Sequence, residues 1–352
     1  MRILIVTDAW PPQVNGVVRT VTSVGLQLQR MGHDVRYLAP EGRKTWAMPL
    51  YPEILLSRVT SAEIENEIDA MVPDAIHVAT EGPLGWAARR ACVRRGMPFT
   101  SSFHTRFAEC VSGKLPIPGL NWLIWKLLRH FHCHSRAVMV PTPTIARQLE
   151  SYGFVNVKTW TRGIDHSVFR RRTRDSLNLP RPILLVAGRV SSEKNIEALL
   201  NTKFRGTKVV VGDGPDRTTL AAKYPDVIFT GYLHEEAYAN ALSAADVFVF
   251  PSRVDTFGLV MIEAMACGTP VAAFDVASPV DVVEPGITGE LDGNLAAAIG
   301  RALKLDRDRV HEAAQKFTWD RTAKMFESWL VCFDYAALGR REAGGESFVH
   351  LR

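Results

Sequence analysis

Short apolar runs alternate with longer amphipathic segments along most of the chain. The first run, residues 2–6, is apolar and β-branched and ends in a loop rich in Pro and Gly. A helix-like stretch at 17–31 and a second apolar run at 33–39 follow it. This order of strand, loop, helix and strand predicts a parallel sheet covered by helices. Three further strands of the same sheet are expected at 75–78, 98–101 and 137–140.

The pattern restarts in the second half of the chain. Residues 182–187 form an apolar run that leads into Gly188, and the segment 259–267, closed by Gly268, is the clearest helix. The other strands expected here are 208–211, 227–230, 247–250 and 270–274. The chain is therefore predicted to be an α/β protein of two doubly wound domains. Ligands of such proteins bind at the carboxyl ends of the strands, so we expect the site in a cleft between the domains.

Length and composition agree with this organisation. The 352 residues suit two domains of roughly 150 residues each, and 47% apolar with 22% charged residues is typical of a globular protein. No apolar run is long enough to span a bilayer, and no leader-like segment precedes the first strand. The five cysteines are widely spaced and are expected to be reduced thiols. These features predict a cytoplasmic protein.

The formal charge of +5 is unevenly distributed. Residues 1–170 hold 20 Lys and Arg against 13 Asp and Glu, whereas residues 171–352 hold 22 against 24. The basic first half indicates an anionic partner, either nucleic acid or an acidic membrane surface. The run 170–174, Arg-Arg-Arg-Thr-Arg, has no apolar period and is expected to be the linker or its edge.

The first loop of the second domain carries two cations. Arg189 follows Gly188 directly, and Lys194 comes five residues later. An Arg fork and a mobile Lys ammonium together suit a phosphate group. The alternative is a solvated loop in which Lys194 pairs with Glu193 or Glu197.

A more specific segment begins at Asp255 and ends at Gly268. It puts four residues at a helix amino terminus, where free backbone N–H groups favour an anion: Phe257, Gly258, Leu259 and Val260. Asp255 precedes the helix and Glu263 lies about one turn inside it, so two carboxylates bracket this position and can accept hydrogen bonds from ribose and sugar hydroxyls. In the alternative interpretation, Asp255 is an acid favoured by the helix dipole and Glu263 is a solvated residue of the helix. This alternative explains Asp255 well. It explains Glu263 poorly, because the residues around Glu263 are nearly all apolar.

These motifs together resemble glycosyltransferase family 4. The features that carry the resemblance are the two acids separated by seven residues in FGLVxxEAMACGTPV, GRxxxxK ahead of them, and PPxxNGV near the amino terminus. The resemblance covers nearly the whole chain and implies the GT-B fold, with transfer of a hexosyl group from a nucleotide sugar, retention of anomeric configuration and no metal cofactor. The chain is most similar to the lipid-directed mannosyl-, sulfoquinovosyl- and glucosyl-transferases of the family. The first acid of the family is usually Glu, and here it is Asp255.

The resemblance also implies domains and roles. The expected divisions are an acceptor-binding domain at 1–168, a nucleotide-sugar-binding domain at 169–318, a helix at 319–338 that crosses back to the first domain, and a tail at 339–352. Arg189 and Lys194 would hold the diphosphate, Glu263 the ribose and Asp255 the donor sugar. The helix terminus would bind the sugar and the β-phosphate. Loops around the donor would contain Gly212, Gly231, Tyr232 and Leu233, the last three by the nucleobase.

The first domain is expected to supply the acceptor side. Asn15 and Gly16 would form a loop where donor diphosphate and acceptor approach the backbone. His104 and Arg106 resemble the active-site histidine segment of the family, with a catalytic role for His104 beside Arg189, Lys194 and Asp255. A satisfied core histidine is the alternative for His104 taken alone. Asp8 would contact the acceptor or only cap the following turn.

No residue resembles a carboxylate nucleophile placed for double displacement, so a same-face transfer is expected, with charge on the departing diphosphate stabilised by the two cations and the helix terminus. Asp306 with Asp308, and the histidines at 130, 132 and 134, are weak metal motifs in better explained contexts. We therefore expect that no metal or other cofactor is needed.

The acceptor is predicted to be a lipid such as diacylglycerol. Residues 121–136 combine an apolar and aromatic set with basic residues, as in helices that lie at a membrane interface. A stripe of Arg89, Arg90, Arg94 and Arg95 would meet anionic headgroups. The alternative is that the apolar face is core and the arginines are solvated. The membrane interpretation predicts a peripheral protein on the inner face of the cytoplasmic membrane, with binding that weakens with salt.

Several rival functions remain at this point. A transferase with a soluble or polysaccharide acceptor fits the same motifs, and a sugar-nucleotide epimerase has the same architecture. A nicotinamide dehydrogenase lacks its GxGxxG signature in both halves, and a nucleic-acid-binding protein would suit the basic half but lacks a recognised module. We therefore expect no nucleic-acid partner. The nucleoside, the hexose and the oligomeric state are not determined by the sequence.

Overall fold

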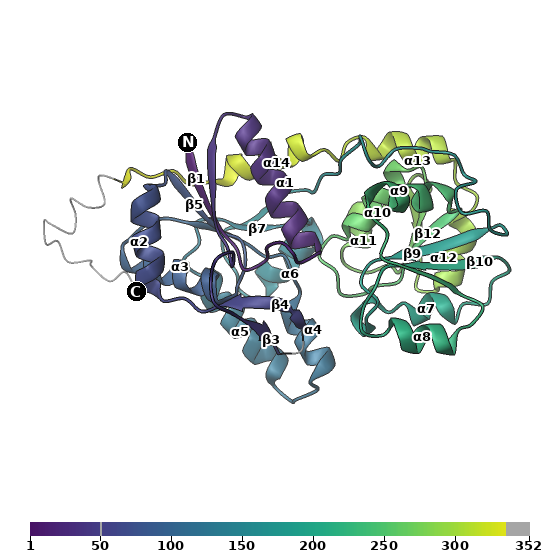
Figure 1. The fold of residues 1–352 in the computed structure, drawn as a ribbon, viewed down its shortest axis with the longest axis horizontal. Coiled ribbons are helices and arrows are strands. Elements are labelled where there is room, and N and C mark those ends of the chain that lie inside the picture. Colours follow the sequence, from purple (N-terminus) through teal and green to yellow (C-terminus); the bar gives the residue numbers. More distant parts are fainter. Residues whose placement is uncertain (50, 336–352) are drawn as a thin grey trace, which may run out of the picture.

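The computed structural model describes residues 1–49 and 51–335 and contains two parallel six-stranded sheets, each in its own domain (Figure 1). The first sheet has the order β2-β1-β5-β6-β7-β8. Its strands are β1 (Arg2–Val6), β2 (Asp34–Leu38), β5 (Ala75–Val78), β6 (Thr100–Ser102), β7 (Val138–Val140) and β8 (Val157–Thr159). Helices cover both faces: α1 (Gly16–Arg30), α2 (Ser61–Met71), α3 (Pro83–Arg94), α4 (Phe107–Lys114), α5 (Leu120–His132) and α6 (Pro143–Ser151).

The second sheet has the order β11-β10-β9-β12-β13-β14. Its strands are β9 (Ile183–Ala187), β10 (Thr207–Val211), β11 (Ile228–Gly231), β12 (Val247–Phe250), β13 (Val271–Ala273) and β14 (Gly289–Leu291). The elements around it are η1 (Ser192–Lys194), α7 (Glu197–Leu200), α8 (Arg217–Lys223), α9 (Glu235–Ala244), α10 (Leu259–Ala266), α11 (Pro279–Val282), α12 (Leu295–Ala302) and α13 (Arg307–Ala314). All strands that pair in these two sheets run parallel. Both sheets are therefore covered by helices on their two faces, as parallel sheets require.

Every strand predicted from the apolar runs is present, with ends shifted by at most two residues. The hydrophobic pattern did not predict the antiparallel hairpin of β3 (Thr45–Met48) and β4 (Tyr51–Ser57). Pro52 lies inside β4, and a proline argues against a strand in a sequence unless the strand is at an edge. The three-residue strands β8 and β14 are too short to show a period.

The last described helix, α14 (Trp319–Trp329), returns to the first domain and packs beside α1 (Figure 1). The buried side chains of Trp319, Ala323 and Phe326 join the first-domain core around Ile3 and Ile5. The predicted extension of this helix to residue 338 is wrong for the described part, because Leu330 is extended and Phe333 donates a backbone hydrogen bond to Asp74. Residues 336–338 and the predicted tail at 339–352 lie outside the described residues.

The two chain crossings between the domains lie side by side. Ile164 pairs with Thr318, and a Cβ on Gly163 would lie 2.3 Å from the backbone nitrogen of Trp319, so the crossing needs a glycine there. Phe169 is already part of the second-domain core. Three arginines of the run at 170–174 form ion pairs with acids of the second domain: Arg171 with Asp308, Arg172 with Glu236 and Arg174 with Asp246. Of the two interpretations of this run, the edge of the linker fits the structure, because the crossing precedes residues 170–174 and these arginines already pair with the second domain.

Candidate active site

A cleft of about 1940 Å³ separates the two domains and is lined by loops at the carboxyl ends of both sheets. It brings together every predicted site residue except Gly231. Gly231 ends β11, where its carbonyl accepts a 2.8 Å hydrogen bond from the backbone of Gly212. Its expected donor contact is therefore not supported, because the residue supports the neighbouring loop from behind while Tyr232 and Leu233 reach the cleft.

The amino terminus of α10 opens on this cleft. Gly258 begins the helix with a φ of 78°, and a Cβ there would lie 2.8 Å from the ring of Phe250. Among residues 1–49 and 51–335, no side chain caps this terminus. Leu259 and Val260 line the cleft beside it, so the N–H groups of the first turn and the helix dipole form an anion-binding position.

Lys194 and Asp255 form an ion pair next to this terminus, with 2.7 Å between Nζ and Oδ1. Burial alone would raise the pKa of Asp255, but the charge and hydrogen bond of Lys194 outweigh it and hold that pKa below its usual value. Asp255 in turn holds the pKa of Lys194 above its usual value, against the effect of burial. The pairing of Lys194 with Glu193 or Glu197 is thus wrong, since Glu197 binds Lys223 instead.

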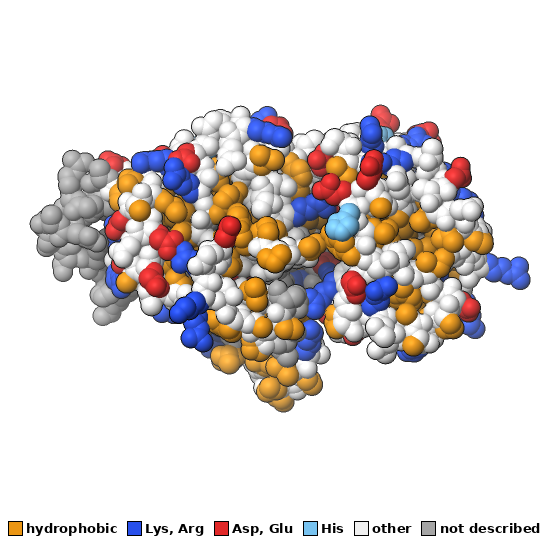
Figure 2. Space-filling model, viewed as in Figure 1, with side chains coloured by type: hydrophobic (Ala, Val, Ile, Leu, Met, Phe, Trp, Pro, Cys, Tyr) orange, Lys and Arg blue, Asp and Glu red, His pale blue; other side chains and the backbone are white. Residues whose placement is uncertain are grey.

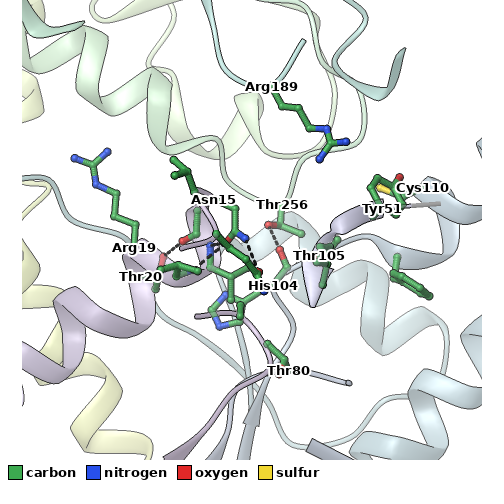
Figure 3. Close-up of a pocket in the computed structure, with 18 of the residues that line it drawn as sticks. Asn15, Arg19, Thr20, Tyr51, Thr80, His104, Thr105, Cys110, Arg189 and Thr256 are labelled. Atoms are coloured by element: carbon green, nitrogen blue, oxygen red, sulfur yellow. Dashed lines mark hydrogen bonds between the residues drawn. The ribbon is translucent and has the colours of Figure 1, made fainter. Parts of the chain in front are cut away.

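Arg189 enters the cleft from the second domain, opposite the first-domain hairpin (Figure 3). Its guanidinium lies 5.6 Å from the ring centre of Tyr51, and its Nε is 3.9 Å from Glu193. The loop that carries it is packed backbone against backbone, because a Cβ on Gly212 would lie 1.9 Å from the carbonyl oxygen of Gly188. Only glycine fits there, so the two loops after β9 and β10 are held together behind Arg189.

Glu263 is buried, at 1% exposed, as the apolar residues around it predicted. Its carboxylate forms an ion pair with Arg19 of α1, so the bridge joins the two domains. The Arg19 guanidinium also lies 5.1 Å from the ring centre of Phe169. Burial, followed by the charge of Glu263, holds the pKa of the neighbouring Tyr238 hydroxyl well above its usual value. The alternative of a solvated helix glutamate is therefore wrong.

His104 follows β6 and is buried where the domains meet. Its carbonyl accepts a 2.7 Å hydrogen bond from Thr256 of the second domain (Figure 3). Its Nδ1 lies 3.3 Å from Arg162, while its buried Nε2 has no hydrogen-bond partner in the part of the chain that the structure describes. Burial, then the charges of Arg162 and His77, hold the pKa of His104 well below its usual value, so the ring is neutral. Arginine only donates, so Nδ1 is the acceptor and the ring proton is on Nε2.

The other first-domain residues have local partners. Asp8 accepts hydrogen bonds from Thr80 and from the backbone of Leu84 and Gly85, which satisfies the start of α3. Burial nevertheless raises the pKa of Asp8. Of the two roles considered for Asp8, this geometry favours capping, although the helix capped is α3 and not the next turn.

Asn15 and Arg106 are similarly occupied. Asn15 caps α1 by accepting from the backbone of Val17 and Val18, both at 3.0 Å. A Cβ on Gly16 would lie 3.5 Å from Leu259, so the amino-terminal loop approaches α10 closely. Arg106 pairs with Glu109 at 2.7 Å.

Sequence reasoning missed two cations of the cleft, Arg19 and Arg162. Arg19 lies near the amino terminus of α1, where the helix dipole makes a positive charge unfavourable. This unfavourable position was the one sign in the sequence that Arg19 has an acidic partner. Arg162 is 3% exposed, and burial lowers its pKa to about 9. It donates to the carbonyl of Thr161 at 3.0 Å and lies 4.2 Å from the ring centre of Trp160. Its isolated position between the domains gave no signal in the sequence.

The expected arginine stripe on α3 is wrong. Arg89 is buried and donates to the carbonyls of Phe131 and His130, while Arg94 pairs with Glu65 and Arg95 with Asp69. The expected membrane-facing side of α5 is exposed only in part. Trp122 and Leu123 are exposed, whereas Trp125, Leu128 and Phe131 belong to the hydrophobic core.

The weak metal motifs have structural roles. Asp306 caps α13 by accepting from the backbone of Asp308, which itself pairs with Arg171. Across residues 1–49 and 51–335, no group of three or more His, Cys, Asp or Glu is arranged to hold a metal ion. In the same part of the chain, no helix combines the length and apolar character needed to cross a membrane.

Comparison with known proteins shows which proteins this chain resembles. Residues 14–168 match the family described as Glycosyltransferase Family 4, and residues 181–305 match Glycosyl transferases group 1. A GDP-mannose-dependent alpha-mannosyltransferase of Mycolicibacterium smegmatis is 31% identical over 376 residues, which cover 97% of this chain and 99% of the relative. An alpha-monoglucosyldiacylglycerol synthase of Streptococcus pneumoniae is 26% identical over 376 residues, covering 93% and 83%.

Solved structures support the architecture. A sucrose-phosphate synthase from Thermosynechococcus elongatus superposes with a TM-score of 0.76 at 21% identity, covering 98% of this chain and 100% of the other. At that identity the likeness shows the fold alone, which is GT-B. With the family matches in both domains and the mannosyltransferase similar over nearly its whole length, the chain belongs to glycosyltransferase family 4 and is a hexosyltransferase.

Proposed function

We propose that the protein is a retaining glycosyltransferase that moves a hexosyl group from a nucleotide sugar to a lipid such as diacylglycerol. The product is an α-glycolipid, and no metal takes part. The observation that carries the proposal is the second-domain wall, where two cations, Arg189 and Lys194, and the amino terminus of α10 line the same cleft. The donor is GDP-mannose, UDP-glucose or a related UDP-sugar, in keeping with the named substrates of the mannosyltransferase relative and the glucosyl product of the diacylglycerol relative.

The donor diphosphate lies, in this proposal, between Arg189, Lys194 and the first turn of α10. Lys194 has three N–H donors, so it can keep its bond to Asp255 while it binds a phosphate oxygen. Asp255 then accepts from a hydroxyl of the donor sugar through its second oxygen, Oδ2, which has no hydrogen-bond partner among the described residues. The base lies toward Gly212, Tyr232 and Leu233.

Glu263 receives the ribose hydroxyls. Its carboxylate is fixed by Arg19, which neutralises a charge that is costly to bury. The bridge thereby orders the first domain against the nucleoside site, and the carboxylate oxygens can accept hydrogen bonds from the ribose hydroxyls.

The reaction proceeds on one face of the sugar. Two acids of the cleft, Asp255 and Glu263, are each held by a cation, and neither is free to act as a nucleophile. As the sugar–phosphate bond breaks, negative charge grows on the diphosphate, and Arg189, Lys194 and the α10 dipole stabilise it. The departing phosphate takes the proton of the acceptor hydroxyl. The neutral ring of His104 contributes hydrogen bonding and no charge.

The acceptor reaches the cleft from a membrane, with the protein peripheral on its inner face. The partly exposed apolar face of α5 supports this, and Lys126, which lies 3.8 Å from the ring centre of Trp122, adds a cation for anionic headgroups. Because this attraction is partly electrostatic, binding to anionic vesicles weakens as salt increases.

A donor and acceptor screen tests the proposal. Labelled UDP-glucose, UDP-galactose, UDP-glucuronate and GDP-mannose are each incubated with the protein and diacylglycerol in mixed micelles, with EDTA present. We expect one donor to give a labelled organic-phase product whose one-bond C1–H1 coupling at the anomeric centre is that of an α-linkage. Label that appears only in water-soluble glycosides, a β-linked product, or activity that is abolished by EDTA would contradict the corresponding part of the proposal.

A further inference from the structure

The cleft extends beyond the proposed donor position into the first domain, where its lining changes character. Away from Arg189 and Lys194 the wall is formed by apolar side chains: Ile54, Leu56, Val59, Trp86, Ile124 and Leu127. They come from β4 and the residues after it, from α3 and from α5. The donor chemistry described above uses none of them.

Three separate elements form the walls of this apolar section, which we call the hairpin groove. Ile54 and Leu56 are two residues apart on β4 and so face the same side, whereas Leu55 faces the opposite side and is 37% exposed. Strand β4 packs next to α3, where Trp86 lies against the edge of Phe131. Ile124 and Leu128 of α5 are buried at 8% and 4% exposed and form the floor. The hairpin thus converts a helix surface into a walled groove.

The outer end of the hairpin groove opens on an exposed apolar patch. Leu127 lines the groove and is 52% exposed, and Trp122 and Leu123 beside it on α5 are 60% and 57% exposed. Leu115 and Ile117, in the connection from α4 to α5, are also exposed. Figure 2 shows hydrophobic side chains gathered at this lower tip of the first domain. Contiguous exposed apolar side chains of this kind mark a binding surface.

We propose that the hairpin groove binds one aliphatic chain of the lipid acceptor. This rests on the proposed function for the identity of the amphiphile, and goes beyond it by assigning a site to the chain. The chain enters over Leu127 from the apolar patch and lies between β4 and α5. The hydroxyl end then points along the same cleft toward Asp255 and the donor.

The lining favours an aliphatic chain over a glycan or a peptide. A glycan needs polar side chains along its length, and a peptide needs backbone hydrogen-bond partners. Polar residues of the first domain that line the same cleft near these elements include Tyr51, Thr60, Ser61, Glu81 and Arg90, and Arg90 is exposed. Burial of methylene groups in a preformed apolar groove is favourable in itself, and one open end allows chains of different length to extend into the bilayer.

Photolabelling with a defined probe tests the hairpin groove. The full chain is irradiated with palmitic acid that carries a diazirine in mid-chain, and the labelled residues are mapped by mass spectrometry. We expect label on β4, on α3 around Trp86 and on α5 around Ile124. The variant Leu56→Trp fills the groove and should lose about tenfold of this label, because a buried apolar contact of this size is worth about a factor of ten in binding. The matched control Leu55→Trp adds the same ring to the opposite face of β4 and should label like the wild type.

Two results would overturn the assignment. Label confined to Trp122, Leu123 and the rest of the patch would mean that the protein only touches the bilayer surface. Equal labelling of both tryptophan variants, with thermal unfolding and nucleotide binding unchanged in each, would also contradict it. The proposed function fails separately, because it is measured as transfer of labelled sugar: groove labelling without any transfer to lipid would keep the chain site and reject lipid glycosylation.

Discussion

The two walls of the cleft differ in how their side chains are held. On the second-domain wall the charged groups have defined partners: Lys194 binds Asp255, and Glu263 binds Arg19. On the first-domain wall, the hairpin groove is lined by apolar side chains, among them Ile54, Leu56 and Leu127. A charged wall must be preorganised to stabilise a developing charge, whereas an apolar wall only needs shape and access. In the proposed function, the charged groups of the second-domain wall stabilise the leaving group and the hairpin groove selects the acceptor, while His104 and Arg19 of the first domain lie where the two walls meet.

Removal of a cation from the charged wall should have the largest effect. Arg189→Ala is expected to lower turnover by about 10²- to 10³-fold, because one stabilising donor of the departing diphosphate is lost. The free energy of unfolding should stay close to that of the wild type. The control Lys203→Ala removes an exposed cation of the same domain, away from the cleft, and should keep its activity. Near-normal turnover of Arg189→Ala would mean that the charged wall does not stabilise the leaving group.

Disruption of the ion pair between Arg19 and Glu263, which joins the two walls, should have the second-largest effect. Arg19→Met leaves Glu263 buried without its cation and should lower the free energy of unfolding by about 2 kcal/mol, a value reduced because Arg19 is partly exposed. The double variant Arg19→Met with Glu263→Gln removes the uncompensated charge and should recover part of that loss. Chemical denaturation of the wild type, of the single variants Arg19→Met and Glu263→Gln, and of the double variant gives the coupling. If the two changes are simply additive, the bridge does not contribute to stability.

A lower pH should reduce the free energy of unfolding through His104, which lies where the two walls meet. Burial and Arg162 keep the pKa of His104 well below its usual value, so only the unfolded chain binds a proton there as the pH falls below about 6.5. Stability contributed by His104 is therefore complete above that pH and is lost toward lower pH, at up to about 1.4 kcal/mol per pH unit. His104→Gln should make the decline between about pH 6.5 and 5 shallower by that amount. Identical pH profiles would show that the ring is protonated in the folded protein.

The exposed apolar patch at the outer end of the hairpin groove should show the smallest effect, and only at a membrane. Trp122→Ser is expected to weaken binding to anionic vesicles by about tenfold, with unfolding unchanged, because Trp122 is exposed. The control Val155→Ser changes another exposed apolar residue, outside the patch, and should bind like the wild type. Co-sedimentation at low and high salt measures both. Equal binding of Trp122→Ser and wild type would remove α5 from the membrane contact.

The sequence predicted the fold well because its strands are buried on both faces. Parallel strands such as 2–6 and 247–250 are continuous apolar runs, and these are visible without any alignment. The hairpin was missed because Pro52 interrupts β4. The last helix was predicted too long because a continued amphipathic pattern does not record where Leu330 turns into extended backbone.

The candidate site was predicted unevenly for a related reason. Charged residues at fixed spacings stand out in a sequence, so Arg189, Lys194, Asp255 and Glu263 were found. Their partners were not all found, since Arg19 is 244 residues away from Glu263 and only the fold brings them together. The apolar wall was invisible, because Ile54 or Leu127 reads like any core residue until its exposure is known. The arginines of α3 led to a wrong prediction of a charged surface stripe. Arginine is usually a surface residue, but Arg89 is buried.

A crystal structure of the full chain with GDP or UDP bound tests the central claim most directly, namely that the second-domain wall holds the donor. The account predicts phosphate oxygens within hydrogen-bond distance of Arg189, Lys194 and the first backbone N–H groups of α10, with the ribose on Glu263. A nucleotide whose diphosphate lies on the first-domain wall, with Arg189 and the α10 terminus unliganded, would contradict it.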